Sequence, residues 1–296
     1  MQLRLPAVAA LALALALILP AAQATPSPDA IPHSQWNAPQ TPFRIYGNTW
    51  YVGPHGLTSL LVDTGHGLAL FDGDLPESAP LIEAHIRALG FRLRDVKWIL
   101  NSHPHADHAG GIATLQAASG AQVLSSAAGA RELALGGADR SDPQFGSIPD
   151  YPPVKQARVV RDGETVRLGN VAVTAHYTPG HTAGSTSWTW TSCEGRRCLR
   201  IAYADSLSAI SAPGYRFLDH PAYVAGFRRA LATVAALPCD ILLTPHPDAS
   251  GFWEKVARRK SPADVAPLID PQACRDYAAD AGKDLDARLA KERAAQ

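Results

Sequence analysis

The amino-acid sequence predicts an α/β protein built as an αββα sandwich, with two mixed sheets packed together and helices on their outer faces. Segments with the alternating pattern of strands are followed by segments with a helical stripe, and this succession occurs in both halves of the chain. No Ser/Gly linker, charge block or low-complexity segment divides the middle of the chain. We therefore expect one domain rather than two.

The first half contains the pattern of five strands and two helices. Residues 43–52 and 58–63 alternate as a hairpin does, and a helical stripe from Leu81 to Leu89 ends at Gly90. The other elements expected here are strands at 67–71, 96–100 and 122–124 and a helix at 109–118. The loop 139–153 is either a wall over a functional site or a plain surface excursion.

The second half repeats the succession. A strand at 171–177 leads to a Pro-Gly-His turn, and residues 186–191 and 199–203 form a second expected hairpin. A helix at 222–236, a strand at 240–243 and a charged helix from residue 271 complete the chain. The same order of elements in both halves favours two similar layers.

The first 24 residues have the pattern of a secretory signal peptide. Arg4 precedes an almost unbroken Ala/Leu run from residue 7 to 19, and Ala22-Gln23-Ala24 is a cleavage signal. The apolar run is short for a membrane anchor, although an uncleaved N-terminal helix is the alternative. We expect a signal peptide at 1–24, an extended arm at 25–42 and one exported, periplasmic domain over 25–296.

The charge balance excludes some classes of partner. The chain has 27 basic and 27 acidic residues and a formal net charge of zero, whereas a nucleic-acid surface normally requires a basic excess. Residues 25–296 contain no apolar stretch long enough to span a bilayer. We expect no nucleic-acid partner, no membrane association after signal cleavage, and a monomer.

Histidines and an aspartate gather in three segments that each follow a predicted strand. Imidazole and carboxylate suit a divalent metal such as zinc, and one site needs only three or four of them. Any one of these residues alone would more often be an ordinary side chain, but their spacing predicts a metalloenzyme. The candidates are His103, His105, Asp107, His108, His181 and His246. The remaining histidines are read as ordinary residues: His33, His55, His66, His85, His176 and His220.

The spacing of the first segment suggests how it could bind metal. Side chains alternate along an extended loop, so His103, His105 and Asp107 are expected to point the same way. His108 would then turn toward a neighbouring position where a helix begins, and Gly110-Gly111 allows close backbone approach. Six candidates are enough for two metal sites.

The four cysteines indicate disulfides, because the chain is expected to be exported. Cys193 and Cys198 flank a turn and could close the second hairpin, in which case Cys239 and Cys274 would join the last strand to the C-terminal helix. Three pairings of four cysteines are possible, and all remain open at this point. A zinc–thiolate site is the alternative, but none of the cysteines lies beside the histidine segments.

Taken in order, these motifs resemble those of the metallo-β-lactamase superfamily over nearly all of residues 25–296. The matching motifs are His103-x-His105-x-Asp107-His108, Gly180-His181-Thr182-x-Gly184, Ala204-Asp205-Ser206 and Pro245-His246. The chain is most similar to the third subclass of metallo-β-lactamases, in the runs 203–209 and 244–251. The first subclass has a cysteine ligand in place of Ser206, and the second lacks the histidine at position 103.

The resemblance implies the roles of individual residues. The first of two Zn²⁺ ions would be bound by His103, His105 and His181, and the second by Asp107, His108 and His246. Ser206 and Ser208 would hold a substrate carboxylate. Asp205 would bridge the metals by analogy with glyoxalase II or support the site from behind by analogy with the lactamases; we favour support. Cys239 and Cys274 resemble a disulfide of the third subclass, whereas His55 stands where some members have a further cysteine.

The implied function is zinc-dependent hydrolysis of the β-lactam ring amide by a metal-bound hydroxide, with Asp107 as a catalytic residue and antibiotic resistance as the consequence. The alternative is another exported dizinc hydrolase of the same fold, such as a lactonase, thiolesterase or phosphodiesterase. A metal-binding protein without turnover is disfavoured, because purely structural sites close their coordination.

Overall fold

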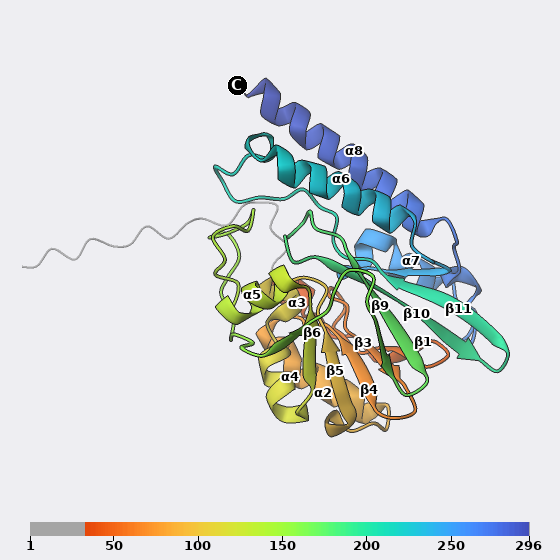
Figure 1. Cartoon of the computed structure of the whole chain (residues 1–296). Helices are drawn as coiled ribbons and strands as arrows, with labels where there is room; N and C mark the ends of the chain where they lie inside the picture. Colours follow the sequence, from red (N-terminus) through yellow and green to blue (C-terminus); the bar gives the residue numbers. More distant parts are fainter. Residues whose placement is uncertain (1–32, 296) are drawn as a thin grey trace, which may run out of the picture. The chain divides into compact units, whose positions relative to one another are not determined.

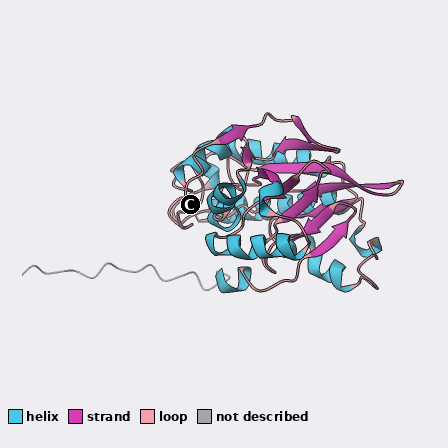
Figure 2. Ribbon diagram, turned by 90° about the horizontal axis from the view of Figure 1, so that it is seen from below, coloured by secondary structure: helices cyan, strands magenta, loops and turns pink. Residues whose placement is uncertain are grey.

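The computed structural model describes residues 33–295, and the expected signal peptide lies outside them. Two sheets pack face to face with helices on their outer faces (Figure 1, Figure 2), so the expected αββα sandwich is confirmed. The larger sheet has seven strands in chain order: β1 (Phe43–Tyr46), β2 (Thr49–Tyr51), β3 (Leu60–Asp63), β4 (Leu68–Phe71), β5 (Val96–Leu100), β6 (Gln122–Ser125) and β7 (Ala157–Val159). The smaller sheet has the order β12-β11-β10-β9-β8: β8 (Thr165–Leu168), β9 (Val171–Tyr177), β10 (Thr186–Glu194), β11 (Arg197–Tyr203) and β12 (Ile241–Leu243).

The helices are grouped by the sheet that they cover. The described α-helices are α1 (His33–Trp36), α2 (Ala79–Ala88), α3 (Ala106–Ala109), α4 (Ile112–Ser119), α5 (Ala127–Leu135), α6 (Pro221–Ala235), α7 (Phe252–Ala257) and α8 (Ala273–Ala294). Apolar residues of α2, α4 and α5 form one core with the outer face of the larger sheet. Those of α6 and α8 form another with the smaller sheet, and a third core fills the space between the two sheets. The short 3-10 helices are η1 (Pro76–Ser78), η2 (Leu93–Asp95), η3 (Phe217–Asp219), η4 (Pro247–Ser250) and η5 (Ala266–Leu268).

Strand direction places the candidate ligands at one edge of the sandwich. In the larger sheet β4 to β7 run parallel. In the smaller sheet β9 and β11 are both antiparallel to β10, and β12 is parallel to β11, so these three strands share a direction. His103 follows β5, His181 follows β9 and His246 follows β12. Ligands in open α/β sheets bind where the carboxyl ends of such strands meet.

Two parts of the expected secondary structure differ from the structure. Residues 43–52 were expected to form one strand, but Gly47 has a φ of +52° and divides them into β1 and β2, which pair with each other. A Cβ atom on Gly47 would lie 2.7 Å from the Cys193 carbonyl oxygen, so the turn needs glycine. The helix expected at 109–118 begins at Ile112, after the separate turn α3. The elements α1, β7, β8, α5 and α7 were not expected, and α1 places a helical turn within the expected extended arm 25–42.

Both expected disulfides are present. Cys193 and Cys198 face each other across the β10–β11 hairpin, and Cys239–Cys274 joins the start of β12 to α8.

Within residues 33–295, no helix is both long and apolar enough to cross a membrane.

Candidate metal centre

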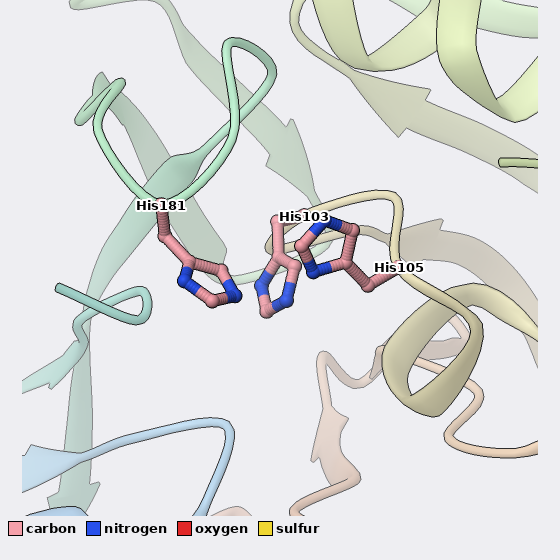
Figure 3. A group of neighbouring side chains, drawn as sticks. All are labelled: His103, His105 and His181. Carbon is pink, nitrogen blue, oxygen red and sulfur yellow. The ribbon is translucent and has the colours of Figure 1, made fainter. Parts of the chain in front are cut away.

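Three buried histidines converge from two loops. His103 and His105 lie in the loop after β5, and His181 lies in the turn after β9. Their candidate ligand atoms lie within 4.8 Å of one another, and the rings point toward a common centre (Figure 3). The three side chains are at most 7% exposed. This is a three-nitrogen set of the kind that catalytic zinc sites use.

A second set lies directly beside the first. Asp107 Oδ2 is 3.2 Å from His108 Nε2 and 3.3 Å from His246 Nε2, and the two nitrogens are 3.2 Å apart. Two ligands of a tetrahedral zinc ion with bonds of 2.0–2.1 Å are separated by about 3.3–3.4 Å. The three atoms therefore already have the mutual spacing of a zinc ligand set. The His103 and His108 ring centroids are 4.3 Å apart, so the two sets adjoin.

The protonation of these side chains suits metal binding. Burial, and then the neighbouring imidazoles, hold the pKa values of His103 and His181 well below their ordinary value. Burial alone would raise the pKa of Asp107, but attraction and hydrogen bonds from His108 and His246 hold it well below its ordinary value. At neutral pH His103 and His181 thus present imidazole lone pairs and Asp107 a carboxylate, as metal binding requires. Burial alone would lower the pKa of His246, but its hydrogen bond to Asp107 and the charge of that carboxylate raise it, so a metal competes with a proton there.

Each ring of the first set has a partner that orients it. His103 Nδ1 lies 2.7 Å from Asp205 Oδ1, and His103 Nε2 has no hydrogen-bond partner among the described residues. His181 Nδ1 lies 2.9 Å from Ser208 Oγ, and His105 Nε2 lies 3.3 Å from Asp142 Oδ2. Such partners fix the tautomer and direct the opposite nitrogen toward a metal. The donor set therefore fits two zinc ions.

A buried aspartate connects the site loop to both sheets. Asp72, which follows β4, accepts hydrogen bonds from Ser102 N at 2.7 Å, Ser102 Oγ at 2.6 Å and Asn101 Nδ2 at 3.0 Å. The hydroxyl of Tyr203 at the end of β11 donates to the same carboxylate at 2.7 Å. The loop that carries His103 is therefore held between the two layers.

The first loop departs from the expected geometry. His103 and His105 are extended, but α3 begins at Ala106, so Asp107 and His108 lie in its first turn. The extended alternation expected from His103 to Asp107 therefore ends at His105, although ligand atoms of His103 and Asp107 still lie within 4.8 Å of each other. The helical turn directs Asp107 and His108 together toward His246, and this produces two sets of ligands.

Several residues near the candidate ligands were not predicted from the sequence. Asp142 contacts His105, and Gln144 Nε2 lies 3.4 Å from His181 Nε2. Both belong to the loop 139–153, so this loop does reach the site. In the sequence, only the residue composition of the loop indicated that it could do so. Trp36 also adjoins the site, with its ring 5.5 Å from that of His246.

The fold and the paired ligand sets define a metal-dependent hydrolase of the metallo-β-lactamase class. The model of the metallo-β-lactamase superfamily matches residues 43–193, and the chain belongs to that superfamily. The sequence is 34% identical to hydroxyacylglutathione hydrolase of Anaeromyxobacter dehalogenans over 49% of this chain and 44% of that protein. It is 27% identical to the hydroxyacylglutathione hydrolase of Acidiphilium cryptum over 90% of each chain. The chain thus spans less than half the length of the first relative and most of the second.

Several solved structures are more similar to this chain than these relatives are. The subclass B3 metallo-β-lactamase MEM-A1, from a soil metagenome library, is 50% identical, with a TM-score of 0.85 over 88% of this chain and 100% of that chain. The metallo-β-lactamase MIM-1 from Novosphingobium pentaromativorans is 48% identical, with a TM-score of 0.83 over 88% of this chain and 93% of that chain. The expected superfamily and the resemblance to the third subclass are therefore confirmed.

Proposed function

We propose that this protein hydrolyses the ring amide of β-lactam antibiotics with two zinc ions, and so confers resistance to them. The observation that carries the proposal is the pair of adjoining ligand sets, in a chain about half identical to a subclass B3 metallo-β-lactamase over its whole fold. Water adds across the C–N bond, so the carbonyl carbon gains a hydroxyl and the nitrogen gains a proton.

The zinc pair would supply Lewis acidity and lower the pKa of water from 15.7 toward about 7. His103, His105 and His181 would hold one ion, and Asp107, His108 and His246 the other. Asp107 remains a carboxylate at neutral pH and can accept a hydrogen bond from the attacking water. Ser206 and Ser208 would bind the substrate carboxylate.

The position of Asp205 favours this function over thioester hydrolysis by a glyoxalase II-like site. A bridging aspartate would have to stand between the two ligand sets. Here Asp205 Oδ1 is 2.7 Å from His103 Nδ1, on the side of the ring opposite the free Nε2. Asp205 would therefore orient His103 rather than bind metal.

The direct test is hydrolysis by the purified protein, starting near Thr25. One penicillin, one cephalosporin, one carbapenem, a thioester and a lactone are assayed side by side. We expect opening of at least one β-lactam, at a rate far above those for the thioester and the lactone. Turnover of the thioester or the lactone alone would assign the chain to the alternative hydrolases.

Metal content tests the same proposal independently of substrate. We expect two zinc ions per chain and complete loss of hydrolysis after chelation, restored by added zinc, because each ligand set supplies three donors. One tightly bound ion at full activity would exclude a dinuclear mechanism.

We also propose that the protein acts in the periplasm as a monomer after cleavage at Ala24. The A-x-A signal and the paired cysteines support export. The N-terminal residue of the protein recovered from the periplasm, read by mass spectrometry, tests the cleavage site.

A further inference from the structure

The two candidate substrate-binding serines lie in a segment without helix or strand. Residues 204–216 connect β11 to η3, and we call them the serine loop because they carry Ser206 and Ser208. Such a segment has no sheet or helix ladder of its own, so its shape depends on contacts with other elements.

The first contact comes from the C-terminal helix α8. The Tyr277 hydroxyl accepts a hydrogen bond from the Leu207 backbone N–H at 3.2 Å and donates one to the Asp205 carbonyl at 3.2 Å. Burial raises the pKa of Tyr277, so the hydroxyl keeps its proton. Ser206 lies between these two backbone groups in the chain, and one hydroxyl thus fixes the peptide units on both sides of it.

The second contact lies further along the same helix. Arg288 Nη2 donates to Ser211 Oγ at 2.7 Å, and its Nη1 lies 3.4 Å from the Ala209 carbonyl oxygen. The Glu292 carboxylate, only 7% exposed, accepts a hydrogen bond from Arg288 Nε at 2.7 Å. The same carboxylate accepts the backbone N–H groups at the start of η3, from Phe217 at 3.2 Å and from Leu218 at 2.9 Å. The planar guanidinium of Arg288 can donate to all of these acceptors at once, whereas the single ammonium group of a lysine could not.

We infer that Tyr277 and Arg288 are positioning residues, through which α8 holds the serine loop in the shape that lets it bind a substrate carboxylate. The inference rests on the proposed function only for the identity of the ligand; the contacts themselves are independent of it. A loop that is already ordered binds its ligand without the cost of ordering. Loss of either contact should therefore weaken substrate binding before it affects the chemical step.

The principal test is Tyr277→Phe, with Tyr223→Phe as its matched control. Both tyrosines pack in the same helical layer, but the Tyr223 hydroxyl has no hydrogen-bond partner within residues 33–295. For a β-lactam with a free carboxylate, we expect Tyr277→Phe to raise KM about fivefold, as loss of a hydrogen bond does. Its kcat should stay within about twofold of the wild type. For the same β-lactam with its carboxylate esterified, KM should not change, and Tyr223→Phe should match the wild type on both substrates.

A second pair of variants tests the other contact. Arg288→Ala should raise KM for the free carboxylate in the same way. Its control, Arg228→Ala, breaks an exposed ion pair between Arg228 of α6 and Asp286 of α8, which lie 2.5 Å apart. The control should leave both kinetic constants unchanged. Equal losses on the free and the esterified substrate would overturn the inference, because α8 would then support the whole site rather than its carboxylate subsite.

Hydrogen exchange distinguishes failure of this inference from failure of the proposed function. In the intact protein, the amides of residues 206–211 should exchange faster in Tyr277→Phe and Arg288→Ala than in the wild type and the two controls. If the wild type opens no β-lactam, the proposed function fails, but faster exchange would still show that α8 holds the loop. Unchanged exchange in both variants would exclude that role whatever the substrate is.

Discussion

Ser206 and Ser208 are separated by one residue in the chain, yet their side chains have different neighbours. Ser208 Oγ lies 2.9 Å from His181 Nδ1, and the Ser208 carbonyl oxygen lies 3.0 Å from the same nitrogen. Ser206 is 7% exposed and follows Asp205, which contacts His103. Ser208 therefore orients a candidate metal ligand in addition to its proposed contact with substrate.

Replacing the two serines separately should separate binding from chemistry. Ser206→Ala should raise KM on the order of tenfold and leave kcat nearly unchanged, because the proposed hydrogen bond to the substrate carboxylate would be lost in the ground state and the transition state alike. Ser208→Ala should also lower kcat and zinc retention, but only modestly, since His181 Nδ1 loses the Ser208 hydroxyl and keeps the Ser208 carbonyl oxygen as its partner. Steady-state kinetics and zinc titration with a competing chelator measure both effects. A Ser206→Ala enzyme with normal KM and little kcat would mean that this serine takes part in the chemistry.

At the scale of the element, α5 brings a buried acidic residue close to the site. Glu132 is 3% exposed, and its Oε1 has no hydrogen-bond partner among the described residues. Burial, and then the charges of Asp142 and Asp139, raise its pKa from 4.5 to about 9. The side chain is therefore neutral in the folded protein at neutral pH, and ionised in the unfolded chain.

Glu132→Gln should make the protein more stable at neutral and alkaline pH. The raised pKa of Glu132 contributes stability that is fully present below pH 4.5 and is lost as pH rises toward about 9. Glutamine has similar size and no charge, so the variant should gain in Tm relative to the wild type as pH rises from 5 to 9. Thermal melts of both proteins across this range provide the measurement. A Tm difference independent of pH would mean that Glu132 does not titrate in this window.

At the scale of the whole molecule, the two disulfides close loops of very different length. Cys193 and Cys198 are 5 residues apart, within one hairpin, whereas Cys239 and Cys274 are 35 residues apart and connect a strand to the C-terminal helix. The entropy lost by the unfolded chain grows with the length of the closed loop. The longer link also fixes the start of the helix that holds the serine loop.

Removing the longer disulfide should therefore cost more stability. The chain-entropy account gives about 4 kcal/mol for Cys239–Cys274 and about 2 kcal/mol for Cys193–Cys198. Double cysteine-to-alanine variants of each pair, compared by denaturant unfolding with zinc bound, test the order. A larger loss for the hairpin pair would show that strain or residual structure, rather than loop closure, governs their contributions.

The sequence by itself predicted the class of fold and the ligand types of the site. The alternation in residues 171–177 and the apolar run 96–100 correspond to β9 and β5, because local side-chain pattern decides which faces can be buried. Three candidate metal ligands could be selected because each follows a predicted strand: His103, His181 and His246. The ends of such strands converge in an α/β sandwich.

The tertiary structure decided which side chains meet. The helical turn α3, which contains Asp107 and His108, spans only four residues. A segment this short shows no helical periodicity in the sequence, so it could not be predicted. The contacts Asp142–His105, Asp205–His103 and Tyr277–Leu207 join positions 37, 102 and 70 residues apart. Local pattern carries no information about such separations, because each contact depends on the packing of whole layers. For this protein, sequence determined the chemistry available, and packing determined how that chemistry is oriented.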